Sequence, residues 1–150
     1  MCLPTFNSHP DEKRDLEPAL LNYLKNVGIS AHVIDGLFDL LIVSPVGRFD
    51  SYLEVKVRLK NGSKSCPITP TQWAFFSGLS PSSSMEANFR ALIYDHQAKK
   101  YALVTASQLS AGIQPKHPKT TSYISAPCLS SLPWGDECVV EKSLHAWIRR

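Results

Sequence analysis

The chain has 150 residues, of which 43% are hydrophobic and 19% charged, a composition typical of a folded protein and not of a disordered one. Its net charge of +3 permits an anionic partner without requiring one. No run of about 18 apolar residues occurs, and the N-terminus lacks the basic and then apolar order of a signal peptide. We therefore expect one domain over residues 1–150, in the cytoplasm or at the nucleoid, with no membrane partner.

Four cysteines, Cys2, Cys66, Cys128 and Cys138, are far apart in the sequence. No two of them show the short spacing of a structural zinc site. In a reducing compartment such cysteines are free thiols. The sequence thus predicts a fold that depends on its apolar core and not on cross-links.

The first regular element is predicted after a loose lead-in at residues 1–14. Apolar residues from Leu16 to Val27 recur at helical spacing, which indicates an amphipathic helix of three turns. Asp15 is the expected N-cap and Gly28 the expected stop. The chain therefore opens on a helix.

Three extended stretches follow, at residues 30–34, 37–44 and 51–59. The pair Asp35-Gly36 between the first two is a strong hairpin signal. The second stretch is apolar on both faces, as in a strand that is covered from both sides. The helix is therefore expected to lead into a three-strand meander.

The rest of the chain begins with a polar, basic loop that ends in Thr69-Pro70-Thr71-Gln72. This tetrapeptide is a capping box with proline at the first helical position, so it predicts a helix at 70–78. We expect the later segments to be a linker loop at 80–88, strands at 89–94 and 101–105, an irregular surface segment at 111–136, a strand at 138–140 and a helix around Trp147.

Three ionisable residues lie on the predicted strands. Side chains alternate along a strand, so Glu54 and Lys56 emerge on the same face. If the second and third strands pair, Asp39 faces Glu54 at about 5 Å. Two carboxylates at that distance repel each other unless a cation lies between them. Hard oxygen ligands of this kind suit Mg²⁺ or Mn²⁺.

The residues Asp39 and then Glu54-Val55-Lys56 resemble the signature of the PD-(D/E)XK nuclease superfamily, an acid on one strand followed by acid-x-Lys on the next. The family's core order of helix, three antiparallel strands, helix and strand is similar to residues 15–95, within a domain core of about 15–106. The resemblance implies an α/β fold with a restriction-endonuclease-like core, in which helices flank a mixed central sheet.

Two further positions resemble particular branches of that superfamily. Glu17, eleven residues before Gly28, is similar in placement to a helix glutamate of archaeal Holliday-junction resolvases. The stretch from Leu53 to Leu79 resembles the VRR-NUC branch, where Ser/Thr-Pro-x-Gln opens the helix after the E-x-K strand. On that resemblance Gln72 would face the site. The chain departs from the family pattern at Phe38, where a proline often precedes the first acid.

The resemblance implies a Mg²⁺-dependent deoxyribonuclease, an endonuclease of DNA repair or recombination, with Mn²⁺ as a substitute ion and with 5′-phosphate and 3′-hydroxyl products. A junction resolvase cuts two strands symmetrically and would act as a homodimer. The expected metal ligands are Asp39, Glu54 and the carbonyl of Val55. Lys56 would handle the attacking water and neighbouring charge, and the remaining site residues would be Glu17 and Gln72 as assisting groups and Arg58, Lys60 and Lys64 as phosphate contacts.

Other interpretations of the same residues are open. Asp39 and Lys56 could form a buried salt bridge, Glu17 could favour the helix dipole, and Gln72 could cap Thr69. The three basic residues could form a solvated loop. At the level of function, the alternatives are a non-catalytic nucleic-acid-binding module of the same fold and a structural domain whose charges are only ion pairs.

Overall fold

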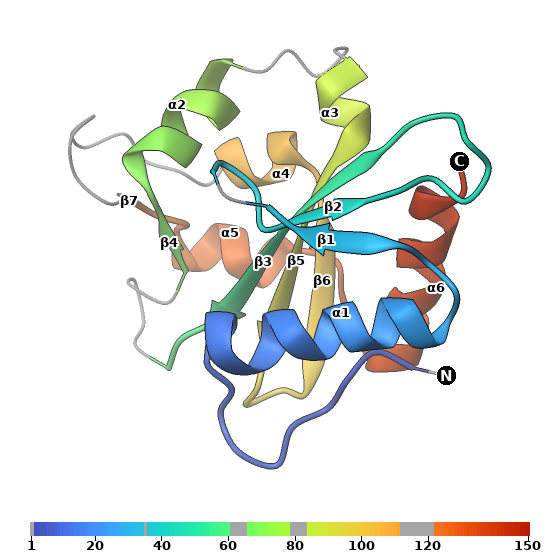
Figure 1. Ribbon diagram of the computed structural model, residues 1–150. Helices are drawn as coiled ribbons and strands as arrows, with labels where there is room; N and C mark the ends of the chain where they lie inside the picture. Colours follow the sequence, from blue (N-terminus) through green and yellow to red (C-terminus); the bar gives the residue numbers. More distant parts are fainter. Residues whose placement is uncertain (1, 35, 61–65, 79–83, 112–121) are drawn as a thin grey trace.

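The computed structural model describes residues 2–34, 36–60, 66–78, 84–111 and 122–150. Figure 1 follows the chain from the N-terminal arm to the C-terminal helix. The helical elements are η1 (Glu12–Leu16, a π-helical turn), α1 (Glu17–Asn26), α2 (Pro70–Gly78), α3 (Ser84–Asn88), α4 (Ala106–Ser110), α5 (Ala126–Ser131) and α6 (Glu137–Ile148). The strands are β1 (Ala31–Val33), β2 (Leu40–Ile42), β3 (Ser51–Arg58), β4 (Pro67–Ile68), β5 (Phe89–Asp95), β6 (Lys100–Val104), β7 (Ser122–Tyr123) and β8 (Trp134–Gly135).

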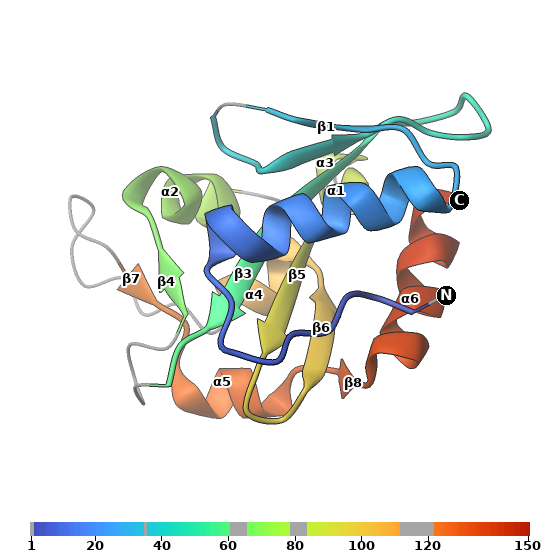
Figure 2. The same ribbon diagram turned by 60° about the horizontal axis from the view of Figure 1, so that its bottom comes forward.

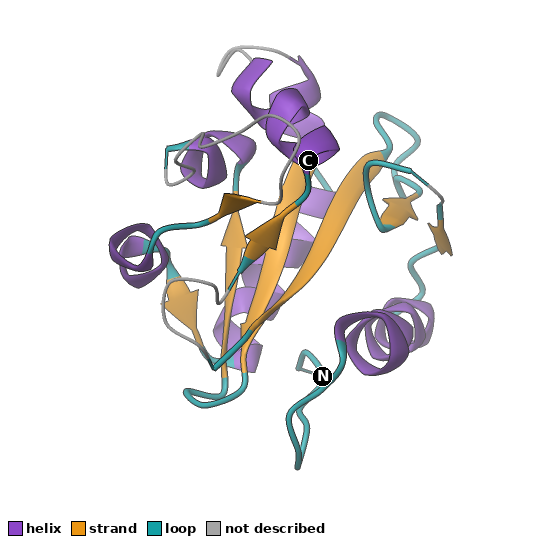
Figure 3. Cartoon of the chain, turned by 90° about the vertical axis from the view of Figure 1, so that its left-hand side faces the viewer, coloured by secondary structure: helices purple, strands orange, loops and turns teal. Residues whose placement is uncertain are grey.

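The main sheet is mixed, as the sequence predicted. Among the described residues it has six strands in the order β1-β2-β3-β5-β6-β8. β3 and β5 run parallel, whereas the other neighbours are antiparallel. The predicted order of helix, three-strand meander, helix and strand is confirmed in α1, β1 to β3, α2 and β5. Figure 3 shows helices on both sides of this sheet.

Each face of the sheet carries its own apolar core, because alternate residues of the central strands point to opposite faces. The helices α1 and α6 cover one face, where they pack on Leu53, Val55 and Val57 of β3. The helices α2, α4 and α5 cover the other face, over Ala91 and Ile93 of β5. β3 therefore lies between two helical layers, and Glu54 and Lys56 point toward the α2 side.

The N-terminal segment is not the loose lead-in that the sequence suggested. Leu3 is buried at 2% exposure, and the hydroxyl of Tyr101 donates to the carbonyl of Pro4 at 2.6 Å. The expectation that Asp15 caps the first helix is wrong, since Asp11 accepts from the N–H of Arg14 and begins the π-helical turn. The early cap adds one turn before α1.

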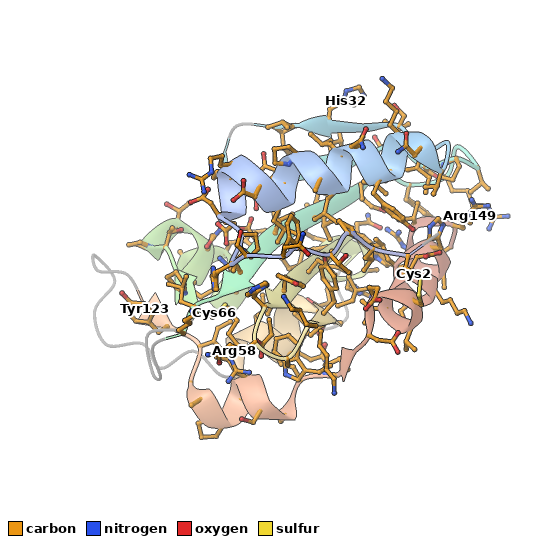
Figure 4. All side chains as sticks on the ribbon, turned by 90° about the horizontal axis from the view of Figure 1, so that it is seen from below. Cys2, His32, Arg58, Cys66, Tyr123 and Arg149 are labelled. Carbon is orange, nitrogen blue, oxygen red and sulfur yellow. A yellow bond between two sulfur atoms is a disulfide. The ribbon has the colours of Figure 1, made fainter. Side chains whose placement is uncertain are left out.

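The prediction that all four cysteines are free thiols is wrong for two of them. Cys2 and Cys138 form a disulfide, with Cα atoms 4.6 Å apart, while Cys66 and Cys128 are free. Figure 4 shows Cys2 beside α6. The backbone N–H of Leu3 also donates to the carbonyl of Glu137 at 3.2 Å. A cross-link and a hydrogen bond thus attach the N-terminal arm to the start of α6.

Three later segments differ from their predictions. The end of the expected linker at 80–88 forms α3. The expected strand at 138–140 belongs to α6, because Asp136 caps the N–H groups of Cys138 and Val139 and begins a helix there. The segment at 111–136 is not an irregular surface in its described part, since it forms β7, α5 and β8 and buries Ile124 and Leu129. No helix in the described ranges has the length and apolar character needed to cross a membrane.

Candidate active site

The candidate site is built on the edge of β3 that β2 leaves unpaired. The β2–β3 pairing ends with Leu40 opposite Leu53. One residue earlier, the N–H of Asp39 donates to the carbonyl of Leu53 at 3.2 Å, so the register places Asp39 opposite Glu54. Asp39 was expected to lie within a strand, but it immediately precedes β2. Its predicted position across from Glu54 is nonetheless what the register gives.

Carboxylates complete the hydrogen bonding of β3 beyond that point. The N–H of Val55 donates to Oδ2 of Asp39 at 2.7 Å, and the N–H of Val57 donates to Oε1 of Glu12 at 3.1 Å. These buried N–H groups need acceptors because, among the described residues, no antiparallel strand continues along this edge. The N–H and carbonyl of one strand residue point to the same side, so the Val55 carbonyl also faces Asp39.

A buried polar cluster connects β3 with the first turn of α2. The amide nitrogen of Gln72 donates to Oε1 of Glu54 at 2.7 Å. Nζ of Lys56 donates to Oε1 of Gln72 at 3.3 Å and to the carbonyl of Pro67 at 3.0 Å, and lies 3.5 Å from Oε1 of Glu54. The three side-chain residues are at most 8% exposed. The acid, the ammonium and the amide therefore form one group.

Gln72 occupies both of the positions that the sequence allowed, next to Thr69 at the start of α2 and beside Glu54 and Lys56. Its backbone N–H donates to the hydroxyl of Thr69 at 3.2 Å, and its side-chain oxygen accepts from the N–H of Thr69 at 3.3 Å. The same side chain contacts Glu54 and Lys56. The capping box fixes the start of α2 and thereby directs the Gln72 amide at the carboxylate.

Glu54 is incompletely satisfied. Its Oε2 atom is buried and has no hydrogen-bond partner among the described residues, a rare state for a buried polar atom. Burial, together with the smaller effects of the Asp39 and Glu12 charges, raises the pKa of Glu54 to about 8, although Lys56 and Gln72 oppose the shift. Without an added cation, a large share of Glu54 is therefore protonated at neutral pH.

Lys13 and Glu17 form the other side of the site. Nζ of Lys13 lies 2.5 Å from Oδ1 of Asp39 and 3.1 Å from Oε2 of Glu17. Figures 1 and 2 show the start of α1 next to the C-terminal end of β3. The structure thus brings Glu17 to Asp39 through Lys13. The alternative that pairs Asp39 with Lys56 does not describe the site, because the cation bound to Asp39 is Lys13.

Sequence reasoning missed two residues here, Glu12 and Lys13. Burial raises the pKa of Glu12, while the charge of Lys56 opposes that shift. The spacing of Lys13 and Glu17 by four residues is a signal that could have indicated their pairing. Glu12 has no comparable signal in the sequence, because its contact with β3 depends on the tertiary position of η1.

The three basic residues proposed as phosphate contacts differ in their surroundings. Arg58 pairs with Asp95 at 3.3 Å, and its guanidinium lies 5.6 Å from the ring centre of Trp134. Figure 4 shows Arg58 at the end of β3, away from Cys2. Lys60 is exposed and lines a cavity of about 410 Å³ together with Arg58 and Asp95. Lys64 lies outside the described residues.

The predicted metal ligands are oxygen donors of two carboxylates and one backbone carbonyl. In the described part of the chain, no group of three or more His, Cys, Asp or Glu side chains could hold a metal ion. Asp39, Glu54 and the carbonyl of Val55 do supply hard oxygen donors along one edge. The unpartnered, buried Oε2 of Glu54 is the atom most in need of a cation. The donor chemistry therefore fits a small hard ion.

The similarity of this chain to known proteins lies in its fold. No protein-family model matches the chain, and no curated protein sequence matches it. The fold is similar to a solved structure of Hjc, a Holliday junction resolvase of the archaeal hyperthermophile Archaeoglobus fulgidus. The identity is 15% and the TM-score 0.46, and the match covers 77% of this chain and 85% of that one.

Proposed function

We propose that this protein is a metal-dependent endonuclease of the PD-(D/E)XK type that hydrolyses DNA phosphodiester bonds. The observation that carries the proposal is the buried Oε2 of Glu54, which has no hydrogen-bond partner in the described chain. It adjoins Val55, whose N–H is bound by Asp39. A site that served only folding would be expected to satisfy such an oxygen, because leaving it unpaired costs about 1–3 kcal/mol.

Asp39, Glu54 and the carbonyl of Val55 would hold the ion. Mg²⁺ is the proposed cofactor and Mn²⁺ a substitute, because both ions accept carboxylate and carbonyl oxygens together with several waters. When bound, such an ion lowers the pKa of a coordinated water and stabilises charge on a phosphoryl oxygen.

The other residues of the site position and neutralise charge. The Lys56 ammonium is held by Pro67, Gln72 and Glu54, so it is preorganised to orient the attacking water and to stabilise the negative charge that develops at phosphorus. Gln72 fixes the direction of the Glu54 carboxylate. Glu17 shares the partner Lys13 with Asp39 and would add negative charge beside it.

The proposed products have 5′-phosphate and 3′-hydroxyl ends, and the proposed substrates are the branched DNAs of repair and recombination. A homodimer would present two such sites for symmetric cleavage of a junction. Arg58, Lys60 and Lys64 are the proposed contacts to phosphates that flank the scissile one.

Cleavage assays on single-stranded, duplex, flapped and four-way-junction DNA would test the proposal, each with Mg²⁺, Mn²⁺ or EDTA at about 50 mM salt, where phosphate contacts are strong. We expect metal-dependent cleavage that Asp39→Ala and Lys56→Ala abolish. Lys25→Ala, which changes an exposed lysine at the end of α1, is the matched control and should cleave normally. Cleavage by Lys56→Ala at the wild-type rate would refute the assignment.

A non-catalytic nucleic-acid-binding module is the second candidate. It is favoured by the hydrogen bonds that occupy the Lys56 ammonium and by the lack of a three-residue metal cluster in the ranges described. This alternative predicts DNA binding that weakens with salt and does not require Mg²⁺. It also predicts intact DNA after long incubation with either metal.

A further inference from the structure

Lys13 holds two carboxylates that come from different elements. Its Nζ lies 2.5 Å from Oδ1 of Asp39, before β2, and 3.1 Å from Oε2 of Glu17, in α1. The carboxylate side chains are 8% and 7% exposed, whereas the Lys13 side chain is 65% exposed. One lysine whose side chain is largely exposed therefore bridges two buried acids.

The π-helical turn accounts for this position. Asp11 caps η1, and the next residue, Glu12, is bound to the N–H of Val57 on β3. This bond fixes the turn against the open edge of the strand, and the following side chain then reaches Asp39. Lys13 also lies four residues before Glu17, a spacing that places both on one side of the helical turn.

The contact has the properties of an exchangeable ion pair. A lysine ammonium is a strongly hydrated charge on a flexible stem, and most of the Lys13 side chain is exposed, so the ammonium can move into water. The carboxylates of Asp39 and Glu17 are buried and cannot move into water as the Lys13 ammonium can. The two carboxylates therefore stay at the site, whereas the cation that faces them can be exchanged.

We propose that Lys13 is the resident counter-cation of Asp39 and Glu17, and that a divalent ion binding at this site displaces the Lys13 ammonium. Lys13 thereby sets the affinity of the site for the ion. The inference rests on the proposed function in one respect, since Asp39 is taken as a ligand of the ion. It goes beyond that function by assigning to a residue outside the E-x-K pattern the control of ion binding.

Calorimetric Mn²⁺ titration of the full chain, with no DNA present, would test this inference. Lys13→Met removes the competing charge, so we expect it to bind Mn²⁺ about tenfold more tightly than wild type, in the ordinary range of coupling between two ligands. Lys13→Gln should change affinity in the same direction and retains a hydrogen-bond donor. Lys13→Arg keeps the charge and should stay near wild type, as should the control Lys25→Met.

Thermal melts in EDTA supply a second readout. Lys13→Met should melt below wild type because two buried carboxylates lose their cation, and Mn²⁺ should raise its melting temperature back toward that of wild type. Unchanged or weaker Mn²⁺ binding by both neutral variants would overturn the inference, and so would an unaltered melting temperature in EDTA. Absence of Mn²⁺ binding by every variant would overturn it as well.

Cleavage by the wild-type protein separates this inference from the proposed function. Tighter Mn²⁺ binding by Lys13→Met, together with no cleavage of any DNA by wild type, would support the inference about Lys13 and refute the proposed nuclease function. Metal-dependent cleavage, together with equal Mn²⁺ affinity in wild type and Lys13→Met, would support the nuclease function and refute the inference about Lys13.

Discussion

Replacing Glu54 with glutamine tests how much the buried carboxyl lowers the free energy of unfolding, separately from its proposed part in catalysis. Glutamine has nearly the same shape and keeps an oxygen that can accept from the Gln72 amide, but it carries no charge. Because burial raises the pKa of Glu54 to about 8 from its ordinary value of 4.5, the folded wild type holds a proton there that the unfolded chain releases. Between these two values the wild-type protein is therefore less stable at higher pH.

The size of the effect follows from that pKa shift. A folded state that binds one more proton than the unfolded state loses about 1.4 kcal/mol of stability per pH unit. From pH 5 to pH 8 the loss approaches an upper limit of about 4 kcal/mol. Glu54→Gln does not titrate, so its advantage over wild type should grow by about 2–4 kcal/mol over that range. In a chain of this length the growth corresponds to about 4–16 °C in melting temperature.

Urea unfolding of both proteins at pH 5 and pH 8, in EDTA, measures this change. Asp50→Asn, which alters an exposed carboxyl before β3, is the matched control and should differ from wild type by the same amount at both pH values. Glu54→Gln should also lose metal-dependent cleavage at least 100-fold, as expected for a lost charged ligand. A stability difference between Glu54→Gln and wild type that is equal at pH 5 and pH 8 would refute the burial argument.

Two further changes probe the site and the disulfide. Gln72→Leu should lower stability by about 1–3 kcal/mol, because Oε1 of Glu54 loses its donor, and should slow cleavage by about 10–100-fold; unaltered urea midpoints and rates would contradict this expectation. Cys2→Ser opens a cross-link between residues 136 apart in sequence, so it should cost about 3–5 kcal/mol in urea unfolding without reductant. Thiol titration of the denatured, unreduced wild type should then find two free thiols, Cys66 and Cys128, and four would disprove the disulfide.

Local pattern predicted those parts of the fold in which a period or a turn signal is complete within a few residues. The strands β3, β5 and β6 fall within a residue of their expected bounds, because their apolar residues match buried strands on both faces. The sequence Cys138-Val139-Val140 was misassigned because β-branched residues favour strands. The capping side chain of Asp136 and the buried stripe of Val140, Leu144 and Ile148 override that preference.

The candidate site was predictable where two sequence neighbours share a face and where a short connection sets a register. This was enough to place Glu54 with Lys56 and to bring Asp39 opposite them. It was not enough for Glu12 and Lys13, whose positions depend on how the N-terminal arm packs against an unpaired strand edge. The disulfide is non-local in the same sense, since nothing in the spacing of four distant cysteines selects Cys2 and Cys138.

The charges on β3 and before β2 have a structural use and a proposed chemical use at the same time, and the individual oxygen atoms divide the two. Oδ2 of Asp39 and Oε1 of Glu54 accept hydrogen bonds from Val55 and Gln72, which hold each carboxylate in place. Their other oxygens differ: Oδ1 of Asp39 faces the Lys13 ammonium, and Oε2 of Glu54 has no hydrogen-bond partner among the described residues. A carboxylate that is fixed through one oxygen keeps the second for a cation without needing to reorganise. Such preorganisation is what metal binding and charge stabilisation require, and Lys13 and the protonation of Glu54 offset its electrostatic cost while no cation is bound.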